Sequence, residues 1–64
     1  MIVSLNGEPR SVSGETLAEV LRECGYDGRF ATAVNEVFVP AGNRGAQPIL
    51  DGDRIEVLGA MQGG

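Results

Sequence analysis

The chain has 64 residues with no histidine and one cysteine, and its nine acidic and five basic side chains give a formal net charge of −4. This length allows one small domain without an ordinary substrate pocket. The missing histidine excludes a Ser-His-Asp or Cys-His nucleophile and a zinc site with histidine ligands, so we expect no enzyme and no bound metal. One cysteine excludes an internal disulfide and favours a cytoplasmic protein. The negative net charge argues against nucleic-acid partners, and the lack of a long apolar run argues against a membrane.

Residues 1–13 are predicted to form a β-hairpin. Met1, Val3 and Leu5 alternate with Ile2 and Ser4, which is the period of a strand. Asn6-Gly7 follows directly, and these two residue types tolerate the positive φ of a type I′ turn. Pro9 cannot donate to a sheet, so we expect the return strand at an edge, over Arg10 to Ser13.

One helix is predicted, from Leu17 to Cys24. Thr16 and Glu19 have the spacing of a capping box at its start, and Gly25 can take the left-handed conformation after its end. The apolar positions recur with helical spacing and define a single buried face, formed by Leu17, Val20, Leu21 and Cys24.

The second half of the chain reads as three short strands. A tight turn at Asn35-Glu36 separates the first two, and Asp51-Gly52-Asp53 turns the chain into the third. One helix across a mixed sheet of four to five strands is the simplest way to bury one apolar helix face, which makes the fold class α+β. The predicted strands are Phe30–Val34, Val37–Val39 and Arg54–Leu58, with a glycine-containing loop over Ala41 to Gln47.

Few side chains before the last residues suggest chemistry. Cys24 has the helical phase of the core positions, so we interpret it as a small buried hydrophobe rather than a nucleophile. Asp51 and Asp53 are too few for a calcium loop and fit a turn. Three acidic residues one turn apart form a stripe that is either solvated or faces a basic partner: Glu15, Glu19 and Glu23.

The last five residues carry the most informative pattern. Residues 60–64 show no periodicity, so we divide the chain into a domain over 1–59 and a flexible tail over 60–64. Gly63 and Gly64 lack a Cβ atom and can pass through a channel too narrow for other residues. A terminal carboxylate is ionised at neutral pH and can act as a nucleophile or, once activated, as an acyl group. The alternative is a frayed end without a function.

Five motifs follow one another along essentially the whole length of the chain. They are Val3-Ser4-Leu5-Asn6-Gly7-Glu8, Thr16 to Leu21, Ala33 to Pro40, Leu50 to Leu58 and the final Gly63-Gly64. In this order they resemble the ThiS family of sulfur carriers in thiamine biosynthesis.

This resemblance implies a ubiquitin-like β-grasp fold and a carrier that is monomeric when free. An E1-like activating enzyme would adenylate the carboxylate of Gly64 with ATP, a persulfide sulfur donor would displace AMP, and thiazole synthase would take sulfur from the resulting thiocarboxylate. ATP would belong to the partner, with no cofactor bound by the carrier. Exposed apolar residues of the last strands would form the docking surface, and the tail would be recognised through Met61, Gln62 and Gly63.

One position departs from the family pattern, and two other functions remain open. The family often has tryptophan about where Arg44 stands, which leaves the packing of that loop open. The small subunit of molybdopterin synthase shares the Gly-Gly end but is usually longer. A TGS-like β-grasp interaction module shares the turns, but such modules do not stop at Gly-Gly, and a charge of −4 disfavours RNA.

Overall fold

The computed structural model describes residues 1–59, and residues 60–64 lie outside the described part. Its five strands form one sheet in the order β2-β1-β5-β3-β4. β5 runs parallel to β1 and antiparallel to β3, so the sheet is mixed, as predicted. The elements in chain order are β1 (Ile2–Leu5), β2 (Glu8–Ser11), α1 (Leu17–Glu23), β3 (Ala31–Val34), β4 (Val37–Val39), the 3₁₀ helix η1 (Ala41–Ala46) and β5 (Arg54–Leu58).

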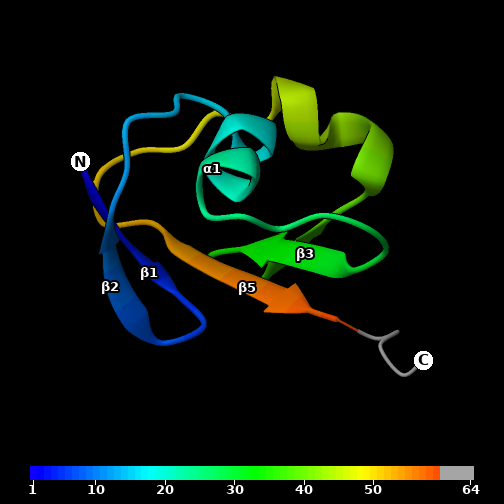
Figure 1. Cartoon of the computed structure of the whole chain (residues 1–64), viewed down its shortest axis with the longest axis horizontal. Helices are drawn as coiled ribbons and strands as arrows, with labels where there is room; N and C mark the ends of the chain where they lie inside the picture. The colour runs from blue at the N-terminus through cyan, green and yellow to red at the C-terminus, as the bar shows by residue number, and fades with distance from the viewer. Residues whose placement is uncertain (60–64) are drawn as a thin grey trace.

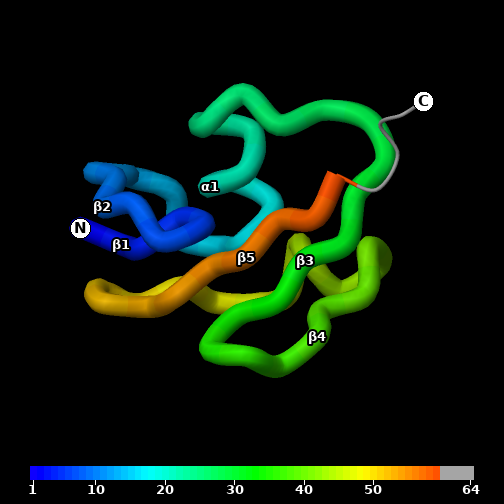
Figure 2. Tube along the Cα trace, turned by 90° about the horizontal axis from the view of Figure 1, so that it is seen from below, coloured from blue at the N-terminus to red at the C-terminus, as the bar shows by residue number. Residues whose placement is uncertain are grey.

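The sheet has one covered and one uncovered face. α1 and η1 both lie on the same side of the strands (Figure 1). Figure 2, seen from below, shows the strands on the opposite side, where no helix of residues 1–59 covers them. Alternate strand residues point to the helix side, as a period of two requires. The core consists of Val3, Leu5, Val12, Leu17, Val20, Leu21, Val34, Val39, Ile49, Ile55 and Val57.

The first hairpin has the predicted turn but an earlier return strand. Asn6 and Gly7 have φ of 52° and 87°, as a type I′ turn requires. The return strand is Glu8–Ser11, so the prediction of Arg10 to Ser13 was wrong. A two-residue turn starts the pairing at once, with Leu5 opposite Glu8. Pro9 then faces Ser4 in the pair that exchanges no hydrogen bonds, so its missing N–H costs the edge strand nothing.

The helix begins as predicted and ends one residue earlier. Thr16 caps it, with Oγ1 accepting from the Glu19 amide at 3.2 Å. In a capping box the Glu19 carboxylate would accept from the amide of the N-cap, Thr16. Here it accepts from the preceding amide, that of Glu15, at 2.8 Å. Cys24 is the C-cap rather than the last helical residue. It is half-buried and packs against the core, which supports its interpretation as a packing residue.

The third acidic side chain of the helix is not simply solvated. The carboxylate of Glu23 accepts from the backbone amides of Ser13 and Gly14, each at 2.9 Å at its shortest. The amides of Gly14 and Ser13 hold the pKa of the Glu23 carboxyl below its ordinary value. Glu23 therefore ties the β2–α1 connection to the end of α1, a role that the helical spacing alone does not reveal.

The segment predicted as a loop over 41–47 is the 3₁₀ helix η1, and that prediction was wrong. The glycines at positions 42 and 45 suggested a loop, yet both fit the short helix. Pro40 precedes it, and the Pro40 carbonyl accepts from the Asn43 amide at 2.9 Å. The side chain of Arg44 binds β3, as described below, so tertiary contacts override the weak local preference.

Candidate functional site

β5 leads directly into the segment that the sequence marks as functional. It lies in the middle of the sheet between β1 and β3 (Figure 2), and the described chain ends just after it, at Gly59. The predicted site residues lie outside the described residues: Met61, Gln62, Gly63 and Gly64. The assignment of these residues stays a prediction, and the structure describes the surfaces from which this segment starts.

The asparagine side chains of both hairpin turns bind β5. Asn6 Oδ1 accepts from the Val57 amide at 2.8 Å, and Asn6 Nδ2 donates to the Val57 carbonyl at 3.3 Å. This side chain thus continues the parallel β1–β5 ladder by one residue. At the other end of the strand, Asn35 Oδ1 accepts from the Arg54 amide at 3.0 Å. Both asparagines were predicted as turn residues, and their contacts with β5 have no local signal in the sequence.

The uncovered face of the sheet carries an apolar surface next to the end of β5. Ala33 of β3 pairs with Phe38 of β4 on one side and with Glu56 of β5 on the other, and Ala31 pairs with Leu58. Directly paired residues share a face of the sheet. We call this surface the outer patch; it consists of Ala31, Ala33, Phe38, Glu56 and Leu58.

The outer patch is open to solvent and hollowed. Phe38 and Leu58 are 64% and 66% exposed, which is high for large apolar side chains. A hollow of about 70 Å³ lies between the side chains of the patch. The expected exposed apolar residues on the last strands are therefore present, and their use in docking stays a prediction. Alternation with buried residues gave this signal in β3 and β5, but not for Phe38, whose neighbour Val37 in β4 is exposed as well.

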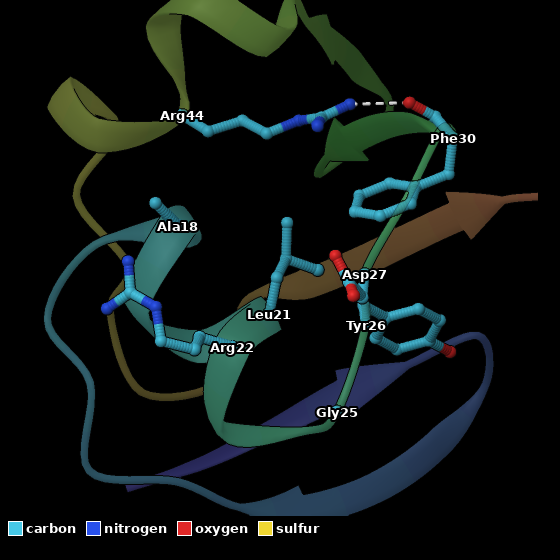
Figure 3. Close-up of a pocket in the computed structure, with 8 residues that line it drawn as sticks. All are labelled: Ala18, Leu21, Arg22, Gly25, Tyr26, Asp27, Phe30 and Arg44. Carbon is cyan, nitrogen blue, oxygen red and sulfur yellow. Dashed lines mark hydrogen bonds between the residues drawn. The ribbon is translucent and has the colours of Figure 1, made fainter.

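A second, wider hollow lies at the side of the helix (Figure 3). It has a volume of about 440 Å³ and adjoins another open hollow of about 480 Å³ that reaches Val57 and Gly59. Tyr26 and Phe30 line both, with ring centroids 5.8 Å apart in an edge-to-face arrangement. The residues around the first hollow are Ala18, Leu21, Arg22, Gly25, Tyr26, Asp27, Phe30 and Arg44.

Arg44 closes one side of this hollow and binds Phe30 and Thr32 at the start of β3. Its Nη2 donates to the Phe30 carbonyl at 2.6 Å (Figure 3), and its Nε donates to Thr32 Oγ1 at 3.0 Å. The guanidinium lies 4.5 Å from the centroid of the Phe30 ring, in cation–π geometry. Arg44 therefore packs η1 against β3. It stands about where the family pattern often has tryptophan.

The described residues offer no metal site. Within 1–59, no group of three or more histidine, cysteine, aspartate or glutamate residues could hold an ion. Asp51 and Asp53 form the predicted turn instead. Asp51 Oδ1 accepts from the Ile2 amide at 2.7 Å, and Asp53 Oδ2 accepts from the Leu50 amide at 2.9 Å. No helix among these residues has the length and apolar character to cross a membrane.

Comparisons with known proteins cover nearly the whole chain or all of it. The family model described as the ThiS family matches residues 3–64. The sulfur carrier protein ThiS of Thermus thermophilus is 44% identical over 64 residues, which cover 98% of this chain and 100% of that protein. The crystal structure of the thiamine biosynthesis protein ThiS from Geobacter metallireducens matches with a TM-score of 0.83 and 26% identity, over 100% of both chains.

Proposed function

Since the chain belongs to the ThiS family, we propose that it is a sulfur carrier of thiamine biosynthesis whose carboxylate at Gly64 is converted to a thiocarboxylate. The observation that carries this proposal is the family match, which extends through residue 64 and so includes the Gly63-Gly64 pair. The protein is a carrier rather than a catalyst. The 44% identity to a ThiS protein over that protein's whole length favours this carrier over the molybdopterin-synthase and TGS-like alternatives.

The proposed chemistry takes place at one carbon atom. A carboxylate oxygen of Gly64 attacks the α-phosphorus of ATP, and pyrophosphate leaves. A persulfide sulfur of a donor protein then attacks the acyl carbon and releases AMP, which leaves an acyl disulfide. A second thiol of the donor attacks the sulfur–sulfur bond, becomes part of a donor disulfide and releases the thiocarboxylate. Thiazole synthase accepts the sulfur, and the carrier returns with an ordinary carboxylate.

The carrier's own contribution is binding and presentation. The activating enzyme binds and uses ATP in the cytoplasm, and no cofactor is required of the carrier. The outer patch supports this role, because exposed apolar side chains beside the end of β5 give partners a surface to hold. Met61, Gln62 and Gly63 are proposed to be recognised along the path to the activating enzyme's ATP, and the two glycines fit a narrow channel there.

Deletion of Gly64 tests this function. The activating enzyme and ATP are incubated with the intact chain or the shortened chain, and the exchange of labelled pyrophosphate into ATP is measured. We expect exchange with the intact chain and none with the shortened one, while both unfold at the same temperature. Unchanged exchange after the deletion would refute the carrier role.

Intact mass provides the second measurement. After expression together with the sulfur-transfer proteins, the chain should gain about 16 Da, because sulfur replaces oxygen at the terminal carboxyl. Cys24→Ser is one control, since Cys24 carries the only thiol in the chain, and the chain without Gly64 is the other, since oxidation of Met1 or Met61 also adds about 16 Da. The Cys24→Ser control should gain the same mass and the shortened chain none; if the mass gain disappears with Cys24, the modified residue is not Gly64.

A further inference from the structure

We propose that the activating enzyme inserts an arginine side chain into the hollow of the outer patch, where Glu56 pairs with its guanidinium. This inference rests on the proposed function, because it requires that an activating enzyme holds the uncovered face of the sheet. It adds the chemistry of the partner's contact residue and makes Glu56 a determinant of partner choice.

The shape of the hollow favours a slim side chain. Ala31 and Ala33 contribute only methyl groups at its floor, while Phe38, Leu58 and Glu56 rise around it. Its volume of about 70 Å³ equals the room of roughly two or three water molecules at ~30 Å³ each. This space fits an aliphatic stem. The apolar walls favour methylene groups over a polar stem.

The charge of Glu56 favours a cation at the end of that stem. Its carboxylate has no hydrogen bond or ion pair within residues 1–59. Arg54 lies two residues earlier on the same face. It forms an ion pair with Glu36 rather than with Glu56, with Nη2 3.6 Å from Glu36 Oε2. A partner that covered this face with apolar groups alone would strip water from an unpaired carboxylate, which is costly. A cationic group from the partner removes that cost.

Phe38 favours arginine over lysine. Its ring is 64% exposed and borders the hollow. A guanidinium is planar, so it can stack on an aromatic ring and bind a carboxylate through two parallel N–H groups. The ammonium of lysine is a compact point charge without this planar, two-pronged geometry. The same molecule contains an internal example, because Arg44 stacks on Phe30 at 4.5 Å while its N–H groups bind oxygen atoms.

The test compares Glu56→Gln with Glu8→Gln in pyrophosphate exchange by the activating enzyme. Both variants remove one negative charge from an exposed strand residue. Glu8 pairs with Leu5 and therefore lies on the other side of the sheet. We expect Glu56→Gln to raise the KM for the carrier about 10-fold without lowering kcat, and Glu8→Gln to leave both unchanged. Ala33→Met, which fills the hollow, should raise KM in the same way.

Chemical cross-linking separates arginine from lysine. A carbodiimide couples a carboxylate to a lysine amine but not to a guanidinium, so the complex should give no cross-link at Glu56. A cross-link there, or an equal KM for Glu56→Gln and the wild type, would overturn the inference. The Gly64 deletion keeps the two proposals distinct: if it abolishes exchange while Glu56→Gln changes nothing, the carrier function stands and the arginine contact is wrong.

Discussion

Asn6→Gly should destabilise the domain through β5, although it keeps the turn intact. Glycine adopts the φ of 52° at this position without strain, so the hairpin geometry is preserved. The variant loses both hydrogen bonds between the Asn6 side chain and the Val57 backbone. Each such bond contributes about 1 kcal/mol, so the loss is about 2 kcal/mol. Glycine adds about 0.5–1 kcal/mol through the entropy of the unfolded chain.

This loss is large for a chain of 64 residues. A stability of ~0.05–0.15 kcal/mol per residue amounts to about 3–10 kcal/mol for the whole domain. Together with the entropy cost the loss is about 2.5–3 kcal/mol, which corresponds to a decrease in Tm of about 10–24 °C in a domain of this size. Thermal unfolding followed by circular dichroism measures the decrease, and hydrogen exchange of the Val57 amide should accelerate in the variant.

Asn35→Gly is the matched control. Asn35 occupies the same turn position, with φ of 51°, and its side chain also makes two hydrogen bonds, to Arg54 and Asp53. Those bonds are exposed, whereas the Asn6 bonds are partly buried, so water replaces the former at less cost. The entropy change is the same for both variants. A decrease in Tm for Asn6→Gly no greater than that for Asn35→Gly would refute the role assigned to the Val57 contacts.

Two further predictions concern single acidic residues. The pKa of Glu23 is lowered from 4.5 in the folded state, so its stabilisation is fully present above 4.5 and disappears as the pH falls through the lower, folded value. Glu23→Gln should therefore unfold at a lower temperature than the wild type at neutral pH, and the two Tm curves should converge in acid; parallel curves would contradict this. Glu36→Gly should stabilise the domain by about 1 kcal/mol in urea unfolding, because Glu36 has a φ of 72° that glycine adopts freely, and its exposed ion pair with Arg54 contributes little. A loss of stability would show that this ion pair outweighs the backbone strain.

Local pattern was sufficient for most elements of the fold. The apolar spacing of Leu17, Val20 and Leu21 located the helix, and the predicted bounds of β4 and β5 agree with the structure. Local pattern failed where distant residues decide the outcome. Glycines at 42 and 45 suggested a loop, but the contacts of Arg44 with β3 hold a 3₁₀ helix there.

The candidate site was predictable only in part, for the same reason. Alternation along β3 and β5 places Ala33 and Glu56 on the face opposite the core. That they lie side by side depends on the pairing of β3 with β5, which no local signal specifies. The second role of Asn6 depends on Val57, which is 51 residues away in the sequence. The family resemblance, by contrast, was predicted from the ordered motifs, and the family match over residues 3–64 confirms it.

The position of β5 also determines how the domain responds to force. A force applied at Gly59 along the axis of β5 acts on the strand at the centre of the sheet. Ladder bonds on both sides lie across that direction, and the amides of Ser4 and Asn6 bind the Asp53 and Ile55 carbonyls, both at 2.9 Å. Such a pull loads these bonds together, in shear, rather than opening them one after another. The domain is therefore built to stay folded under tension at the end where its sulfur is proposed to be loaded and removed.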